Sequence, residues 1–114
     1  MTKVKFIYNP FSGENLILTQ LDKIIKLYQD KNLQIIPFRI SLDTPLEKAF
    51  IDIDETYDHI LAAGGDGTIN QVVNLIKANN LALLLAVLPV GTANDFAKLI
   101  GATSDIEENC KKIL

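Results

Sequence analysis

The residue types best suited to chemistry lie between Ile60 and Gln71, where the sequence reads Ile-Leu-Ala-Ala-Gly-Gly-Asp-Gly-Thr-Ile-Asn-Gln. An apolar run ends at three glycines within four positions, and a helical pattern begins directly afterwards. These glycines leave backbone N–H groups without side-chain cover at the start of a helix, an arrangement that binds phosphate. Asp66, held among them, can position a metal ion or a reacting hydroxyl. The simpler alternative is a tight strand–helix turn that Asp66 caps.

Two more polar segments follow apolar runs of the sequence. Residues 9–13 (Asn-Pro-Phe-Ser-Gly) come after the first run, and residues 91–95 (Gly-Thr-Ala-Asn-Asp) come after the last. Ser41 adds a hydroxyl after the second run. Because ligands of parallel α/β sheets bind at the carboxyl ends of the strands, we expect these segments and the glycine segment to form one rim. Taken singly, each segment also fits an ordinary turn or a helix cap.

Apolar periodicity predicts the elements that carry these segments. Short apolar, β-prone runs predict strands at 4–8, 33–40, 57–63 and 82–88. Helical spacing predicts helices at 14–31, from 44 to about 51, from 68 onwards, before Gly101 and from 104 onwards. The second and third of these helices are expected to start at capping boxes, Thr44-Pro45-Leu46-Glu47 and Thr68-x-x-Gln71.

The alternation of strands and helices predicts an α/β fold, a three-layer α/β/α domain with a mainly parallel sheet. The third and fourth strands are uniformly apolar, which predicts burial on both faces of the sheet. A chain of 114 residues without a linker forms one small domain or part of a larger one. Its last helical stripe stops at Leu114 without a C-cap, so we expect a truncated chain.

Composition narrows the classes of function. The net charge of −3 gives no long-range attraction for nucleic acid. The ten-residue apolar run 81–90 contains a proline and is too short to cross a bilayer. No signal peptide is recognisable at the N-terminus, and one cysteine excludes an internal disulfide, so we expect a cytoplasmic location. The only histidine, His59, lies within a predicted strand and is expected to be structural.

Two common phosphate-binding motifs are absent from the sequence. It contains no Gly-x-x-x-x-Gly-Lys-Ser/Thr segment, which excludes a P-loop. The dinucleotide pattern Gly-x-Gly-x-x-Gly fails because position 70 is asparagine. What remains is a glycine segment with its own carboxylate, which suits phosphoryl transfer with a metal ion.

The segments 9–13, 64–68 and 91–97, in this order, resemble the diacylglycerol kinase catalytic-domain family, which includes bacterial lipid kinases and the sphingosine and ceramide kinases. The resemblance covers essentially the whole chain. The Gly-Gly-Asp-Gly motif is also similar to that of NAD kinases and phosphofructokinases. The Asn-Pro-x-Ser-Gly and Gly-Thr-x-Asn-Asp-Phe-Ala segments favour the lipid-kinase branch.

This resemblance implies ATP-dependent phosphorylation of a lipid hydroxyl, with Mg²⁺ as a further cofactor. It implies a catalytic role near the γ-phosphate for Asp66, and it assigns no metal ligand firmly within the chain. Ser41 stands where relatives often have threonine, and it keeps the hydroxyl. The residues expected to bind the nucleotide are Asn9, Ser12, Gly13, Ser41, Gly64, Gly65, Asp66, Gly67, Thr68, Asn70, Gly91, Thr92, Asn94 and Asp95.

Enzymes of this family are longer, with a second, mostly β domain that supplies acidic metal ligands and a candidate general base. The chain therefore matches the N-terminal nucleotide-binding lobe, and we expect it to have little or no kinase activity alone. Peripheral membrane contact is expected through the other domain, and a homodimer is possible. The alternatives are an NAD kinase-like or other small-molecule kinase, and a non-catalytic nucleotide-binding module.

Overall fold

The computed structural model describes residues 1–11 and 17–89 of the chain. Four strands in this part form one parallel sheet in the order β2-β1-β3-β4. The strands are β1 (Thr2–Tyr8), β2 (Leu33–Arg39), β3 (Tyr57–Gly64) and β4 (Leu84–Pro89). The predicted strands at 4–8, 33–40 and 57–63 therefore agree to within two residues at each end.

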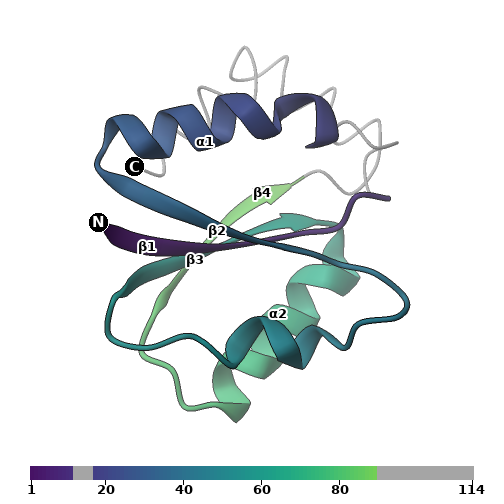
Figure 1. The fold of residues 1–114 in the computed structure, drawn as a ribbon. Coiled ribbons are helices and arrows are strands. Elements are labelled where there is room, and N and C mark those ends of the chain that lie inside the picture. Colours follow the sequence, from purple (N-terminus) through teal and green to yellow (C-terminus); the bar gives the residue numbers. More distant parts are fainter. Residues whose placement is uncertain (12–16, 90–114) are drawn as a thin grey trace.

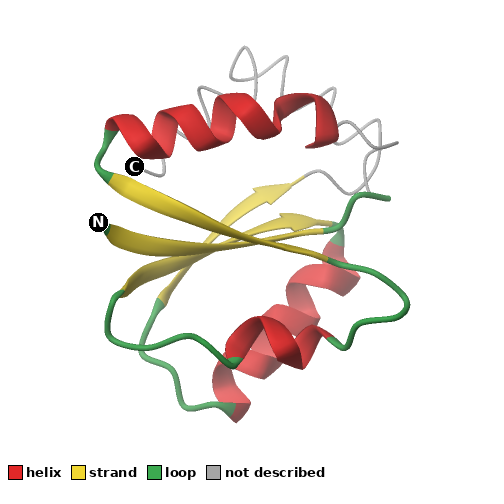
Figure 2. Ribbon diagram, viewed as in Figure 1, coloured by secondary structure: helices red, strands yellow, loops and turns green. Residues whose placement is uncertain are grey.

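Helices cover both faces of this sheet. The helix α1 (Leu21–Asp30) lies on one face, whereas α2 (Asp66–Ala78) and the short 3₁₀ helix η2 (Leu46–Phe50) lie on the other (Figure 1). The helix–sheet–helix layering is plain when the elements are coloured by type (Figure 2). This arrangement confirms the predicted three-layer α/β/α fold with a parallel sheet.

Each sheet face has its own apolar core. On the α1 face, Phe6 of β1 packs with Ile24 and Tyr28, which lie one turn apart on the helix. On the opposite face, Ile7 packs with Val72 of α2 and with the segment around η2. Alternate residues of one strand thus serve opposite cores, as the two-residue period of a strand requires.

The helix α1 begins later than the sequence predicts. Residues 17–20 form a 3₁₀ turn, and the α-helix starts at Leu21 rather than at Glu14. Positions 14–16 lie outside the described residues. After the helix, Asn32 has a φ of 61°, a left-handed conformation that asparagine tolerates and that turns the chain into β2.

The predicted capping box at 44–47 is wrong. The helix η2 begins at Leu46, with Pro45 in an extended conformation (ψ 140°) as its N-cap, and no side chain caps it. Its buried residues are Ala49 and Phe50, which join the core on the α2 face. Burial of these two residues therefore sets the short helix, and the local capping signal of Thr44 and Glu47 does not.

The predicted capping box at Thr68 and Gln71 is also wrong. The helix α2 begins at Asp66, two residues earlier, and Gly65 is its N-cap in an extended conformation. Thr68 already belongs to the first turn and is 9% exposed. Its side chain packs inward instead of capping the helix.

The prediction that the third and fourth strands are buried on both faces of the sheet is confirmed for β3 and is wrong for β4. Seven of the eight β3 residues are buried, with Asp58 as the exposed one. In β4, Leu84 is 77% exposed and Val87 is 37% exposed. The physical reason is strand order, because β3 lies between two strands whereas β4 is an edge strand within the described residues.

His59 of β3 makes two side-chain hydrogen bonds at the α1 face. Its Nε2 lies 3.2 Å from the Tyr28 hydroxyl and its Nδ1 lies 2.8 Å from a carboxylate oxygen of Asp58. The residue is 7% exposed, and its partners join β3 to α1. These contacts agree with the structural role predicted for it.

Candidate functional site

The carboxyl ends of the parallel strands bring most of the described candidate residues to one edge of the sheet. Tyr8 is paired with Arg39 on one side and with Ala63 on the other, so the loops after β1, β2 and β3 start side by side. The N–H of Ile40 donates to the Tyr8 carbonyl at 2.9 Å and extends this pairing towards Ser41. The predicted convergence of these loops is therefore observed. The candidates Ser12, Gly13, Gly91, Thr92, Asn94 and Asp95 lie outside the described residues.

The connections that follow the neighbouring strands β1 and β3 go to opposite faces of the sheet. The chain leaves β1 for the helix α1 on one face, and it leaves β3 for α2 on the other (Figure 1). Two neighbouring strands whose connections go to opposite faces define the switch point at which open α/β sheets bind their ligands. The loop after Tyr8 and the glycine segment after Ala63 flank this point.

Asn9 joins these two loops through its side chain. Its Nδ2 donates to the Thr68 hydroxyl at 3.3 Å, and its Oδ1 accepts a 2.9 Å hydrogen bond from the Phe11 N–H. Its own N–H donates to the Ala63 carbonyl at 2.9 Å. The turn at Asn9 is thus both a local Asx turn and a link from β1 to the first turn of α2.

The glycines of the segment have different reasons to be glycine. A Cβ added at Gly64 would lie 2.8 Å from the Thr68 Cβ and 2.9 Å from its hydroxyl, so no side chain fits there. A Cβ added at Gly67 would meet nothing within 4 Å. Gly64 therefore permits close strand–helix packing, and Gly67 leaves the exposed start of the helix uncovered.

The N-terminus of α2 presents backbone donors at this edge. The Ile69 N–H donates to the Gly65 carbonyl at 3.0 Å and is the first bond of the helix. The N–H groups of Asp66, Gly67 and Thr68 precede this bond and have no carbonyl partner within the helix. Asp66 and Gly67 are exposed, so the positive end of the helix dipole faces outwards and favours an anion.

The carboxylate of Asp66 does not belong to a cluster of potential metal ligands within the described residues. Within residues 1–11 and 17–89, no group of three or more His, Cys, Asp or Glu side chains is placed to hold a metal ion. Mg²⁺ is commonly bound by one or two carboxylates together with substrate phosphates and water. An exposed carboxylate at a helix start with unpaired backbone donors fits that mode as a single ligand.

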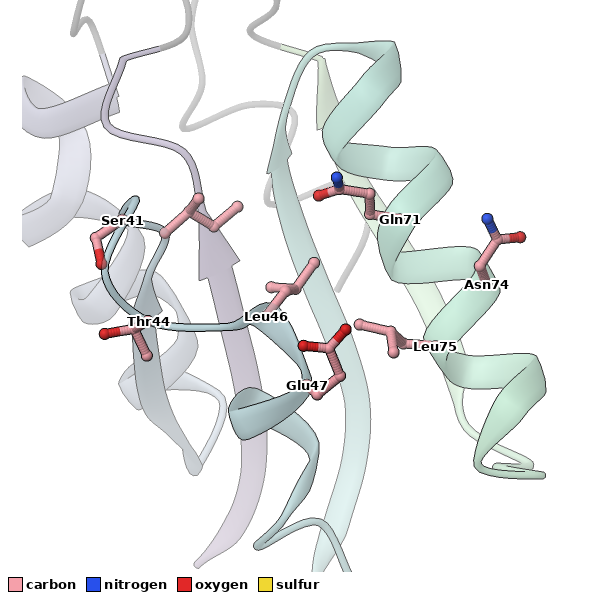
Figure 3. Close-up of a pocket in the computed structure, with 8 residues that line it drawn as sticks. Ser41, Thr44, Leu46, Glu47, Gln71, Asn74 and Leu75 are labelled. Carbon is pink, nitrogen blue, oxygen red and sulfur yellow. The ribbon is translucent and has the colours of Figure 1, made fainter.

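Ser41 lines a pocket of about 340 Å³ between η2 and α2. Figure 3 shows Ser41 and Thr44 on one side of this pocket and Gln71 and Asn74 of α2 on the other, with Leu46 between them. The pocket lies on the face of the sheet that α2 and η2 cover. Sequence reasoning missed Thr44, Gln71 and Asn74 as pocket residues, although the i, i+3 spacing of the two amides places them on one helix face.

The perturbed titrating groups lie at the other end of the sheet. The Lys5 ammonium contacts a carboxylate oxygen of Asp52 at 2.6 Å, and the Tyr57 hydroxyl donates to the other oxygen at 2.7 Å. Burial raises the pKa of Asp52, but the two hydrogen bonds and the charge of Lys5 bring it below its ordinary value of 3.8. Burial and the neighbouring carboxylate raise the pKa of Tyr57. This network holds the segment before β3 against β1.

Comparison with known proteins agrees with this geometry. The family model described as "Diacylglycerol kinase catalytic domain" matches residues 3–114. The chain belongs to this family. A diacylglycerol kinase of Staphylococcus aureus is 38% identical over 107 residues, which are 91% of this chain and 33% of the relative. One from Bacillus subtilis is 33% identical over 102 residues, which are 89% of this chain and 34% of that protein.

A solved structure extends the likeness to three dimensions. The crystal structure of a diacylglycerol kinase from Bacillus anthracis str. Sterne superimposes with a TM-score of 0.68 at 31% sequence identity, covering 98% of this chain and 41% of that one. The chain thus spans about a third of the length of its curated relatives. Among the helices of the described residues, none is long and apolar enough to cross a membrane.

Proposed function

We propose that the chain is the ATP-binding part of a lipid kinase that transfers the γ-phosphate of ATP to a hydroxyl of a diacylglycerol-like lipid. The observation that carries this proposal is the Asn9–Thr68 link, which joins the loop after β1 to the exposed start of α2 at the switch point. Family membership over residues 3–114 supports the lipid-kinase reaction.

In this proposal the start of α2 binds phosphate groups of the nucleotide. The N–H groups of Asp66, Gly67 and Thr68 have no partner within the helix and serve as donors. The open space around Gly67 lets a phosphate approach the backbone closely. Asn9 fixes the opposing loop, so the donors are held in place before the ligand arrives and little ordering is needed on binding.

Asp66 acts next to the transferred phosphate. Its carboxylate either contributes one ligand to Mg²⁺ or orients the lipid hydroxyl for in-line attack, and both roles need it at the first turn of α2. Mg²⁺ held by Asp66 would neutralise part of the charge on the phosphates. Transfer then rests on positioning and charge neutralisation.

The rest of the reaction belongs to parts of the kinase that the chain does not span. We propose that a second domain supplies the general base, further metal ligands and the contact with the membrane. The isolated chain then binds nucleotide and has little or no kinase activity. A cytoplasmic location and a possible homodimer belong to the same proposal.

The substitution Asp66→Asn in the full-length enzyme tests the role of Asp66. It removes the charge and keeps the size, so the rate of diacylglycerol phosphorylation should fall by at least about a hundredfold if one electrostatic contact to the transition state is lost. Asp22→Asn is the matched control, since Asp22 is also an exposed aspartate in the first turn of a helix, but of α1. Full activity of Asp66→Asn would show that the assignment is wrong, and phosphorylation of NAD instead of diacylglycerol would refute the lipid-kinase proposal.

A further inference from the structure

Arg39 lies at the carboxyl edge of the sheet, where the neighbouring residues are acidic or uncharged. In the described segments of this edge, 9–11, 39–46 and 64–68, it is the only lysine or arginine, and Asp43 and Asp66 are the carboxylates. The chain as a whole carries a net charge of −3. An anionic ligand that reaches this edge therefore finds a single basic side chain among these segments.

The guanidinium of Arg39 lies over an aromatic ring. Its Cζ lies 5.6 Å from the centroid of the Phe11 ring, and Phe11 is 65% exposed. A guanidinium carries five N–H donors and a cation–π contact does not occupy all of them, so donors stay available to a phosphate. Within the described residues Arg39 forms no ion pair, since the pairs there involve Lys5, Lys26 and His59.

The backbone of Phe11 is linked through Asn9 to the start of α2. Asn9 accepts the Phe11 N–H through Oδ1 and donates to Thr68 through Nδ2. One asparagine thus bonds both the backbone that carries Phe11 and the first turn of α2. The strands β2 and β3 are separated by β1, so their ends are two strand spacings, about 10 Å, apart.

We propose that Arg39, held on Phe11, binds a phosphate of the nucleotide at the β2 side, while the start of α2 binds another. The separation of the two contacts favours a ligand with more than one phosphate, a nucleoside diphosphate or triphosphate. This inference rests on the proposed function and adds to it a residue that sets affinity for the polyphosphate.

Equilibrium binding of Mg-ATP to the chain, measured by calorimetry, tests the proposal. A charge-assisted hydrogen bond contributes enough for its loss to weaken binding at least about tenfold, which is the result expected for Arg39→Gln. Phe11→Leu keeps the charge but removes the ring and should weaken binding about two- to fivefold. The matched control is Lys31→Gln, which removes one positive charge from an exposed residue at the opposite edge and should change affinity less than twofold.

The outcomes separate this inference from the proposed function. The urea midpoint of Arg39→Gln should match that of the wild type, because an exposed side chain is replaced. If the wild type binds ATP and Arg39→Gln binds as tightly as Lys31→Gln, Arg39 is only a surface arginine packed on a ring, and the inference is wrong while the nucleotide site stands. If the wild type binds no ATP, both the proposed function and the inference fail.

Discussion

Substituting alanine for two glycines of one segment should change stability in opposite directions. At Gly64 the new methyl carbon would lie 2.8 Å from the Thr68 Cβ, a contact that real Cβ atoms essentially never make. Because the Thr68 Cβ is fixed to the backbone of α2, the clash is relieved only by moving the helix away from β3. Overpacking of this kind costs about 1–3 kcal/mol of unfolding free energy.

Gly67 is the matched control for this clash. A methyl group there meets nothing within 4 Å, and the residue is already helical. Replacing glycine by alanine at a compatible position stabilises a protein by about 0.4–1 kcal/mol, chiefly by restricting the unfolded chain. The two variants should therefore differ by about 1.4–4 kcal/mol, with Gly64→Ala the less stable.

Urea unfolding followed by circular dichroism measures this difference. With a slope of about 1–3 kcal/mol per molar urea, the midpoints of the two variants should lie roughly 0.5 M or more apart. Gly64→Ala should also weaken Mg-ATP binding, since the shift of Thr68 breaks its 3.3 Å hydrogen bond from Asn9. Equal stability of the two variants would refute the assignment of Gly64 to packing and of Gly67 to open space.

Two further predictions concern hydrogen bonds. Asn9→Ala leaves the Thr68 hydroxyl without its donor and should lower the unfolding free energy by about 1–2 kcal/mol, measured in urea; a change below about 0.3 kcal/mol would argue against the link. Asp52→Asn should destabilise the chain at pH 7, where Lys5 and Tyr57 contact a carboxylate. Because the pKa of Asp52 is lowered by folding, that stabilisation is present above about pH 3.8 and is lost as the pH falls through the folded value. The gap between wild type and variant in urea titrations should thus shrink towards pH 3, and a constant gap would contradict the contribution of the carboxylate.

At the two predicted capping boxes, tertiary packing determines where the helix begins, and the local sequence signal does not. The pattern at Thr68 and Gln71 is a reasonable helix start, yet Thr68 is buried against Gly64 and the helix begins at Asp66. Likewise the signal at Thr44 gives way to a helix set by buried Ala49 and Phe50. Burying apolar side chains outweighs a single cap, which contributes about 1 kcal/mol.

Apolar burial on β4 depends in the same way on long-range information. The run from Leu81 to Leu88 is as apolar as a doubly buried strand, and Leu84 is nevertheless exposed. The hydropathy of a residue indicates whether burial is favourable for its side chain. The order of the strands determines whether a neighbouring element is there to bury that side chain. The order β2-β1-β3-β4 depends on pairings between residues far apart in the chain.

The sequence by itself determined the alternation of strands and helices, the parallel sheet and the meeting of Asn9 with the glycine segment at one edge. Periodicity is local, and parallel strands place their carboxyl ends together, so these features follow from neighbouring residues and simple topology. Only the tertiary structure decided which glycine is packed and which is open. It alone also placed the one basic residue of the described edge segments over the ring of Phe11. Those features depend on distances between side chains from different strands and helices, which no local pattern encodes.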